Sequence, residues 1–440
     1  MTAVKDEGSE GWVARPIIEW CLIALGVLVV SATLAPNVGG DGAVRYASVQ
    51  GFLLGEGQFS KFSLVQPLLS MPLAWLAVAL HVDPSTFVAY FNYLVFIALA
   101  IPAYRQLARR YGGATGRAWL LLMLCASMFP HHLQNYYGEV LSALCLFLGV
   151  LWVERRSWAS MMLMAIGCVN TPALLPPFLG LALVWFALDK KKVPCASAAI
   201  AIAAIALELW FKHAGAADGY FSDGEHGFQT ILPYSGRPGF SYPVILGTLS
   251  ILLSFGKGLV FYIPGIFLGM SERVRASLRL DARSSLIALV ALVGPVLLYA
   301  KWWAWYGGSF WGPRFFLYLC APACLVMARI LQQRDLSLPR LCLLWLVILL
   351  SVWVSVDGYI FAQGEMDACW AENYAKEYLC WYVPEFSALW RPFVTGRVWT
   401  VFEQTRGIYA VWSLVALCYM SGLIIRNHIH AARLRDRSAH

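Results

Sequence analysis

Long apolar stretches recur along almost the whole chain, and they constrain its fold more than any other feature. Runs of mainly apolar residues begin near Trp20 and continue to Ile425. A helix needs about 20 such residues to cross the roughly 30 Å of hydrocarbon in a bilayer. Hydrophobic residues make up 60% of the chain and charged residues 13%, whereas soluble domains carry about 25% charged residues. The sequence therefore predicts an all-α polytopic membrane protein and excludes a soluble domain.

We expect a single polytopic membrane domain over residues 1–440, with about 12 transmembrane helices. The first apolar run lacks a good signal-peptidase site and is followed by further spans, so we expect it to be retained. The predicted spans are 17–35, 85–103, 117–130, 139–153, 158–170, 173–188, 195–212, 257–270, 285–301, 315–331, 340–356 and 408–425. Two more apolar stretches, 64–80 and 243–254, would place arginine-rich ends outside if they spanned. We predict interfacial or re-entrant segments there.

The formal charge of +8 comes from cations that cluster at the ends of the apolar runs. Such clusters report topology, because short cytoplasmic loops carry an excess of lysine and arginine. Nucleic acid is therefore not an expected partner. With the N-terminus in the cytoplasm, the clusters at 105–117, 155–156, 190–192, 273–283 and 426–437 lie inside. The predicted outer loops are then 36–84, 131–138, 213–256, 302–314 and 357–407.

Nine of the eleven cysteines lie within apolar runs, where a thiol behaves as a small hydrophobe. The exceptions are Cys369 and Cys380, which both fall in the predicted outer loop 357–407. An oxidising compartment would let these two pair as a disulfide. Two unpaired interfacial thiols are the alternative.

The first outer loop carries an acid among glycines, in the stretch GGDGAVRY at residues 39–46. Because glycine places no side chain between the backbone and a ligand, a substrate can approach Asp41 closely. The carboxylate at the membrane edge is well placed to act as a base. The alternative is that Asp41 caps a helix beginning at Gly42.

The second outer loop, 131–138, is followed by Glu139 at the start of the next apolar run. Acids at the membrane boundary are costly to bury, so they are candidates for function. Glu139 could orient an acceptor hydroxyl or a donor sugar, or it could simply favour the helix N-terminus. His131 and His132 are adjacent, lack the spacing of metal ligands and have no cysteine nearby, so we expect no metal site.

Lys257 stands between two glycines in the stretch SFGKGLVFYIP at residues 254–264. A lysine at a probable helix start adds a point charge to free backbone N–H groups, which suits a phosphate. The stretch lacks the full P-loop pattern. The alternative is a lysine whose ammonium reaches from the membrane into the interface.

The segment KWWAWYGGSFWGPR at residues 301–314 combines many aromatic residues with two adjacent glycines and an arginine. An interfacial aromatic belt accounts for some of its tryptophans. The Gly-Gly turn and Arg314 indicate a binding site in addition to this belt, because a guanidinium at the outer end of a span can hold two phosphate oxygens. Flat aromatic rings beside it can pack on a sugar face or a polyprenyl chain.

The glycine-rich acid loop, the stretch around Lys257 and the segment ending at Arg314 occur in an order that resembles the GT-C superfamily of membrane glycosyltransferases. The resemblance is to bacterial members, especially the protein-mannosyltransferase-like and lipid A aminoarabinose-transferase-like branches, and covers roughly residues 36–331. It implies a GT-C-like helical enzyme that uses a polyprenyl-phosphate sugar. The implied location is a bacterial inner membrane, with the active site facing the periplasm or exterior.

In this resemblance Asp41 matches the catalytic acid of the first outer loop. The family often has a second acid nearby in that loop, whereas here the neighbours are glycines, which leaves Glu139 as an alternative base or partner. Arg314 and Lys257 match positions near the carrier phosphate, and Arg45 is a further candidate there. The aromatic residues expected to contact sugar or lipid are Trp303, Trp305, Tyr306 and Tyr262.

The implied reaction is a direct displacement, in which Asp41 accepts a proton from the acceptor hydroxyl as its oxygen attacks the anomeric carbon. Arg314, helped by Lys257, would stabilise the negative charge that grows on the departing polyprenyl phosphate. Such a reaction inverts the anomeric configuration and needs no metal or other cofactor. The expected partners are the polyprenyl-phosphate sugar donor, a lipid, glycan or protein acceptor, and membrane lipids.

Two other classes fit parts of the pattern. A secondary transporter also has about a dozen spans, but transporters commonly show inverted repeats and broken helices at the midplane, and the halves of this sequence show no such symmetry. O-antigen polymerases and ligases share the lipid carrier and depend on arginines in a large outer loop. Arg391, Arg397 and Arg406 match that feature in part, whereas the glycine-rich acid loop does not.

Overall fold

The structure is a computed structural model that describes residues 10–55, 59–154, 157–214, 227–308, 310–333, 336–362, 370–395 and 399–439. The regular elements in these ranges are helices. No strand occurs in them beyond one isolated bridge, which joins Asn37 to Asn135.

The helices differ widely in length. The longer ones are α1 (Glu10–Thr33), α5 (Phe91–Tyr111), α10 (Leu175–Asp189), α11 (Val193–Ala214), α15 (Ala282–Lys301), α17 (Leu338–Ile360) and α21 (Val401–Ala439). The others are α2 (Asp41–Leu54), α3 (Val65–Ala79), α4 (Pro84–Val88), α6 (Gly113–Cys125), α7 (Phe129–His132), α8 (Glu139–Trp152), α9 (Ser157–Asn170), α12 (Val244–Leu253), α13 (Leu259–Tyr262), α14 (Glu272–Ser277), α16 (Cys320–Leu331) and α20 (Glu377–Tyr382). Short 3-10 helices are η1 (Pro172–Leu174), η2 (Pro264–Met270), η3 (Arg314–Leu319), η4 (Ala371–Tyr374), η5 (Pro384–Phe386) and η6 (Arg391–Phe393).

Eight helical segments among the described residues are long and apolar enough to cross a membrane. They are Arg15–Thr33, Pro84–Tyr111, Pro172–Asp189, Val193–Lys212, Ala282–Lys301, Arg314–Leu331, Leu338–Ile360 and Val401–Ile429, and each coincides with a predicted span. Three further predicted spans, near 117–130, 139–153 and 158–170, are the shorter apolar helices α6, α8 and α9. The chain is therefore a helical integral membrane protein, as the apolar pattern predicted.

The predicted span at 257–270 is wrong, because this stretch is not a continuous helix. It consists of the four-residue α13 followed by the 3-10 helix η2, which Pro264 opens. Proline has no N–H to donate and its ring clashes with the preceding turn, which favours a break in the helix. Other helices, such as α5 and α15, continue through an internal proline, but the chain breaks at Pro264. The two stretches predicted as interfacial form α3 and α12, of 15 and 10 residues. Their position relative to the membrane stays a prediction.

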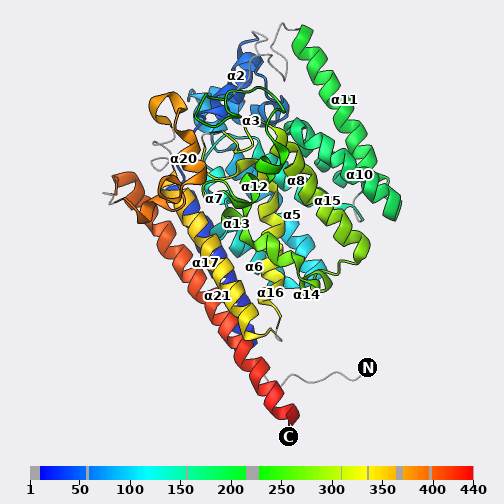
Figure 1. The fold of residues 1–440 in the computed structure, drawn as a ribbon, viewed down its shortest axis with the longest axis vertical. Helices are drawn as coiled ribbons and strands as arrows, with labels where there is room; N and C mark the ends of the chain where they lie inside the picture. The colour runs from blue at the N-terminus through cyan, green and yellow to red at the C-terminus, as the bar shows by residue number, and fades with distance from the viewer. Residues whose placement is uncertain are drawn as a thin grey trace.

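The molecule has two distinct ends (Figure 1). Helices α2, α3 and α20 lie at one end, whereas α14 and the C-terminal part of α21 lie at the other. Helices α17 and α21 pack together and run along the length between the ends. The arginine-rich turns around α14 and the candidate site residues of α2 therefore lie at opposite ends, which is the arrangement that the charge pattern predicted.

A buried carboxylate links three helices through ion pairs and a hydrogen bond at the end away from α2. Glu19 of α1 has a side chain only 1% exposed, and its oxygens accept hydrogen bonds from Arg15 Nε at 2.9 Å and from Arg117 Nε at 2.6 Å. Tyr419 of α21 donates a third, at 3.0 Å. Because these donors come from α1, α6 and α21, the ion pairs hold the helix ends together.

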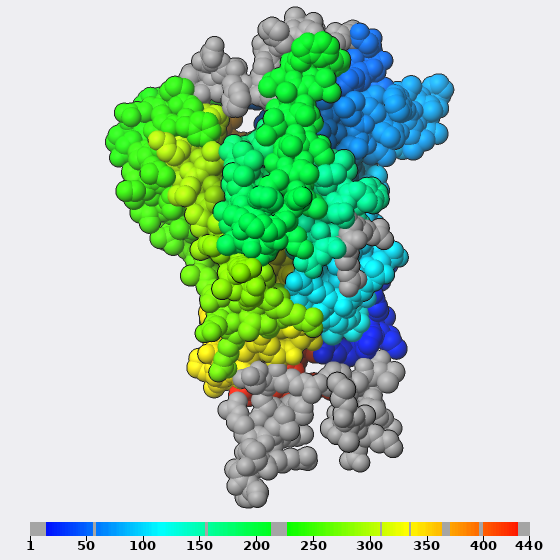
Figure 2. Space-filling view, turned by 90° about the vertical axis from the view of Figure 1, so that its right-hand side faces the viewer, coloured from blue at the N-terminus to red at the C-terminus, as the bar shows by residue number. Residues whose placement is uncertain are grey.

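Burial separates a central set of helices from a peripheral one. In the segment Arg314–Leu331, 78% of the residues are buried, against 28% in the segments that contain α10, α11 and α15. Figure 2 shows α10 and α11 covering one face of the molecule, with α15 beside them. The outer surfaces of these peripheral helices carry exposed leucines such as Leu183 and Leu297, as expected for helices that contact lipid.

Candidate active site

Two short loops that are far apart in the sequence are joined at the α2 end. The backbone N–H of Asn37 donates to Gln134 O at 2.8 Å, and that of Tyr136 donates to Asn37 O at 3.2 Å. This bridge places the loop before α2 beside the loop before α8. As a result, Asp41 at the start of α2 and Glu139 at the start of α8 face the same arginine.

Arg314 is the centre of the candidate site. Its Nη2 donates to Asp41 Oδ2 at 2.5 Å, and its Nη1 lies 3.5 Å from Glu139 Oε1. Its Nε donates to Gly307 O at 2.6 Å. The guanidinium side chain is 7% exposed, and its ring contacts include Phe310, whose centroid lies 4.4 Å from the guanidinium carbon. Three separate nitrogen atoms are therefore used, which only the planar fork of arginine allows.

Asp41 is the first residue of α2, and the predicted alternative that it caps this helix is wrong. The N-cap is Gly40, and no side chain there makes a cap hydrogen bond. Gly40 has φ +57°, and a Cβ at that position would lie 2.9 Å from the Phe310 ring. Glycine is therefore required to turn the chain so that Asp41 reaches Arg314. The Asp41 side chain remains 28% exposed, so a substrate can reach it.

The electrostatic surroundings keep Asp41 ionised. Burial alone would raise the pKa of its carboxyl, but the charge of Arg314, the hydrogen bond from Arg314 and the charges of Arg45 and Lys61 together hold this pKa below its usual value. Hydrogen bonds and opposite charges favour the ionised form of an acid in this way. Asp41 is therefore a carboxylate at neutral pH.

Arg45 stands one turn after Asp41 on the same helix. The residue is 6% exposed, and its guanidinium carbon lies 4.5 Å from the centre of the Phe62 ring. A Cβ at Gly138 would lie 2.5 Å from Arg45 Nη2, so Arg45 passes directly against the residue before Glu139. Burial lowers the pKa of Arg45, while the charges of Glu139 and Asp41 oppose that shift.

Two buried polar atoms at this place have no hydrogen-bond partner within the described part of the chain. They are Arg45 Nη1 and Glu139 Oε2. Buried polar groups in folded proteins are nearly all paired, and each exception asks for an explanation. Here both exceptions belong to residues of the same charged cluster, so the cluster retains one donor and one acceptor for a ligand.

Lys257 lies beneath the loop that precedes Arg314. The residue is 2% exposed, and its ammonium donates to the carbonyl oxygens of Gly308 at 3.2 Å and Gly312 at 3.1 Å, and to that of Phe310. Burial and the charge of Arg314 lower its pKa to about 7. A direct contact with phosphate stays a prediction, whereas the observed bonds hold the carbonyl groups of Gly308, Phe310 and Gly312 in place.

The loop before Arg314 needs its glycines to direct its carbonyl groups toward Lys257 and Arg314. Gly307, Gly308 and Gly312 have φ of +78°, +76° and +67°, values that residues with a Cβ rarely adopt. The left-handed turns direct successive carbonyl groups toward Lys257 and Arg314. The loop thus ends with Arg314 in a fixed orientation.

The four aromatic residues predicted to touch sugar or lipid are mostly buried in protein contacts. Tyr262 and Trp305 are each 2% exposed and Tyr306 is 3% exposed. Tyr306 donates to Glu377 at 2.9 Å and packs on Trp381, with ring centres 3.8 Å apart. Trp303 is partly exposed. Substrate contact by these residues stays a prediction, and their observed role is to support the loop that carries Arg314.

The predicted histidine and cysteine features fall outside the ion cluster. His131 Nδ1 lies 2.7 Å from Gly358 O, and burial lowers the pKa of His131 to about 4, which keeps the ring neutral. Among the residues that the structure describes, no group of three or more His, Cys, Asp and Glu could hold a metal. Cys380 is disulfide-bonded, and Cys369, its predicted partner, lies outside the described residues.

The arginines that would suit a polymerase or ligase do not join the cluster around Arg314. Arg406 is buried, and its Nη1 donates to Tyr359 O at 2.7 Å while its Nη2 donates to Gln134. Arg391 begins the short helix η6, and Arg397 lies outside the described residues. Arg406 therefore serves as a packing contact behind the loop that carries Gln134.

Several residues of the site were not found by sequence reasoning. Phe62 and Phe310 cover the two arginines, and Gly138 admits Arg45 beside Glu139. Phe310 and Gly138 each lie in or beside a segment that was singled out, so their proximity in sequence to Arg314 and to Glu139 was a usable signal. Phe62 has no such signal, because only the tertiary structure places its ring over Arg45.

No protein-family model and no curated protein matches the sequence. Among solved structures, the chain is similar to ArnT from Cupriavidus metallidurans, whose crystal structure was determined bound to undecaprenyl phosphate. The two share 14% sequence identity, and the match covers 96% of this chain and 78% of that chain with a TM-score of 0.49. At this identity the likeness is one of fold alone.

Proposed function

We propose that this protein is a GT-C-like glycosyltransferase that moves a sugar from a polyprenyl-phosphate carrier to a hydroxyl of an acceptor. The observation that carries the proposal is the cluster of Asp41, Glu139, Arg314 and Arg45. It combines a reachable carboxylate with a buried guanidinium and with two unpartnered polar atoms. The resemblance of the three motif segments to GT-C enzymes supports the same reading.

The charges of the cluster suit a phosphodiester. Asp41 and Glu139 face Arg314 and Arg45, and Lys61 adds a further positive charge near Asp41. With three cations to two carboxylates, the cluster can take up one negative charge, which is the charge of a phosphate esterified to both a sugar and a polyprenol. Guanidinium groups bind phosphate oxygens in pairs, and Arg45 Nη1 has no competing partner among the described residues.

Donor binding would activate the base. A phosphate on Arg314 competes with Asp41 for Nη2 and brings a negative charge close to the carboxylate. Both effects raise the pKa of Asp41 from its lowered value, because a like charge and a lost hydrogen bond disfavour the ionised form. Asp41 thus becomes a better proton acceptor only when the donor is present.

The transfer step then follows from the positions of these groups. The acceptor oxygen attacks the anomeric carbon as its proton passes to Asp41, and the bond from that carbon to the phosphate oxygen breaks. The electron pair stays on the departing polyprenyl phosphate, which gains a second negative charge. In this proposal Arg314 and Arg45 contact the departing phosphate and stabilise its growing charge, the electrostatic effect that usually contributes most to catalysis. Direct attack inverts the anomeric centre.

The finer assignments remain part of this proposal. The site would face the periplasm or exterior of a bacterial inner membrane, and the acceptor would be a lipid, a glycan or a protein. The charge pattern supports this orientation, because the arginine-rich turn around α14 lies at the end away from Asp41.

The test is transfer from radiolabelled polyprenyl-phosphate sugars to acceptors in a membrane extract, with purified full-chain protein. We expect label transfer by the wild type, loss of turnover by a factor of about 10² to 10⁴ in Asp41→Asn, and retained carrier binding in that variant. The matched control is Asp83→Asn, because Asp83 is an exposed helix cap and asparagine also caps well. Near-normal transfer by Asp41→Asn would refute the base assignment. No transfer with any donor, together with solute uptake in proteoliposomes, would favour a transporter.

A further inference from the structure

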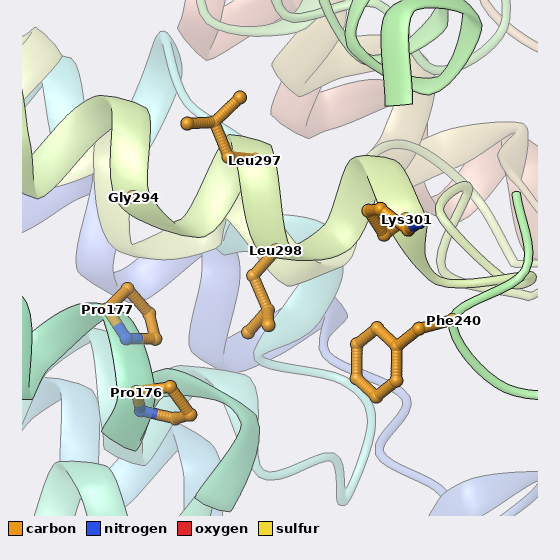
Figure 3. A pocket seen from close by; sticks show the side chains of 7 residues that line it. All are labelled: Pro176, Pro177, Phe240, Gly294, Leu297, Leu298 and Lys301. Carbon is orange, nitrogen blue, oxygen red and sulfur yellow. The ribbon is translucent and has the colours of Figure 1, made fainter. Parts of the chain in front are cut away.

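A cleft opens between two peripheral spans, away from the ion cluster. Its volume is about 380 Å³, which is within the range of small-ligand pockets. Pro176 and Pro177 of α10 line one wall, four residues of α15 line the other, and Phe240 closes one end. Figure 3 shows Leu298 pointing into the space between Pro176 and Phe240, with Lys301 at the same end as Phe240.

The sequence explains the shape of the cleft. Gly294, Leu297, Leu298 and Lys301 follow the spacing that places residues on one face of a helix. A Cβ at Gly294 would lie 3.0 Å from Pro177 Cβ, so the two helices are in close contact there. Beyond this contact the small proline rings leave space along α15 as far as Lys301.

The cleft opens toward the lipid-facing side of the molecule. Leu183 on α10 and Leu297 on α15 are 57% and 48% exposed, and both helices belong to segments that can cross a membrane. Its lining is hydrocarbon except for Lys301. An apolar cleft offers water no hydrogen-bond partners, so in a bilayer it will be filled by a lipid chain.

A single cation marks the polar end of the cleft. Lys301 is the last residue of α15 and is exposed, and its ammonium makes no hydrogen bond or ion pair within the described residues. The rim is held by two backbone bonds, from Trp303 N to Gly239 O at 2.9 Å and from Tyr242 N to Lys301 O at 3.0 Å. Phe240 packs on Trp302 with ring centres 5.0 Å apart. Lysine and tryptophan at the end of a span mark the level of lipid headgroups.

This cation is on a different face of α15 from the candidate active site. Tyr299, two residues earlier, is 4% exposed and stacks on Phe315 with ring centres 4.6 Å apart. Phe315 follows Arg314 directly, so the Tyr299 face of α15 looks toward the ion cluster. Lys301 lies on the cleft face, so a phosphate held there would be separate from one held by Arg314.

We propose that the cleft binds one acyl chain of an anionic glycerophospholipid whose phosphate pairs with Lys301. The hydrocarbon wall receives the chain, and the unpaired ammonium favours a headgroup with a net negative charge over a zwitterionic one. The choice of a bilayer phospholipid over the sugar carrier rests on the proposed function, which assigns the carrier phosphate to Arg314 and Arg45. The lipid would lie between α10 and α15 and stabilise their packing. The binding of an anionic lipid at Lys301 itself does not depend on the proposed glycosyltransferase activity.

The test uses native mass spectrometry of the full-chain protein in detergent, titrated with phosphatidylglycerol or phosphatidylcholine of identical acyl chains. We expect the wild type to retain one phosphatidylglycerol at about five-fold lower concentration, since one lysine near a headgroup is worth about that factor. Lys301→Met should remove this preference. The matched control is Lys376→Met, because Lys376 is also an exposed lysine but pairs with Glu372, and it should keep the preference.

Two further arms make the outcome decisive. Leu298→Trp fills the cleft and should weaken the binding of both lipids. If this core-side substitution impairs folding, the test still rests on Lys301→Met, because Lys301 is exposed and its replacement leaves the packing intact. Equal binding of the two lipids by the wild type, or an unchanged preference in Lys301→Met, would overturn the proposal. So would displacement of phosphatidylglycerol by polyprenyl phosphate in the wild type, because the cleft would then belong to the carrier.

Discussion

Replacement of Arg314 tests the central contact of the site most directly. Its guanidinium uses three nitrogen atoms for three acceptors, namely Asp41, Glu139 and Gly307 O. Arg314→Lys keeps the positive charge but offers a single nitrogen, which cannot reach three acceptors that are arranged around a planar fork. Arg314→Ala also removes the charge and leaves two carboxylates near each other.

The expected magnitudes follow from burial. Removal of one partner of a buried ion pair costs about 3–5 kcal/mol, and because the Asp41 side chain is 28% exposed, solvent screening brings the cost for Arg314→Ala to about 3 kcal/mol. In Arg314→Lys we expect a loss of about 1.5–3 kcal/mol, the worth of one charged hydrogen bond. Misplacement of the remaining cation by about 1 Å should lower turnover by about 10²-fold.

The assay is sugar transfer per folded molecule, with the thermal denaturation midpoint in detergent measured in parallel. Arg117→Lys is the matched control, because Arg117 is 11% exposed and pairs with Glu19 at 2.6 Å at the opposite end of the molecule. We expect that control to lose stability and keep turnover. The reasoning is refuted if Arg314→Lys retains the turnover of the wild type, or if it loses no more turnover than Arg117→Lys.

Three other predictions concern neighbouring groups. Lys257→Met should lower turnover by about 10²-fold, because the carbonyls of Gly308, Phe310 and Gly312 lose their donor. The pKa of Lys257 is lowered to about 7 in the folded state, so the folded protein releases this proton at lower pH than the unfolded chain does. The stability of the wild type relative to Lys257→Met should therefore rise from pH 7 to 10, which thermal melts measure. The lowered pKa of Asp41 predicts that its contribution to stability is complete above pH 3.8 and is lost below that value; a stability difference between wild type and Asp41→Asn that already fades near pH 6 would contradict this. Reduction of the Cys380 disulfide should lower the free energy of unfolding by about 2–5 kcal/mol. It should also slow transfer, because the carbonyl oxygen of the neighbouring Trp381 accepts from Gly256 N at 3.0 Å and its ring packs on Tyr306. Thermal melts and transfer rates with and without dithiothreitol measure both effects.

The spans illustrate how far apolar pattern alone can lead. Helices α10, α11 and α15 were predicted within a few residues, because a run of about 20 apolar residues has few alternatives in a bilayer. The stretch 257–270 has the same composition but breaks at Pro264 into α13 and η2. Several of its residues, such as Leu259, Tyr262 and Ile263, are buried against other helices, which the composition of the stretch does not reveal.

In the candidate site, too, the sequence identified some of the residues but not the contacts between them. Asp41, Glu139 and Arg314 could be selected because charged residues at the ends of apolar runs are costly unless they are used. The sequence does not contain the bridge between Asn37 and Asn135 that brings the two acids to one arginine. Lys257 was selected for its charge and its flanking glycines, yet its partners are backbone carbonyls, which every residue possesses and no pattern marks.

The sequence by itself determined that this chain is a helical membrane protein and which few charged residues lie at the ends of its spans, because the hydrocarbon thickness and the cost of burying charge act on every segment locally. Only the tertiary structure decided which of those charges meet, which aromatic rings are buried, and that an apolar cleft ends at Lys301. Those outcomes depend on contacts between segments that are distant in the sequence, such as the ion pair between Asp41 and Arg314. Such contacts are set by the packing of whole helices and leave no periodic signal in the chain.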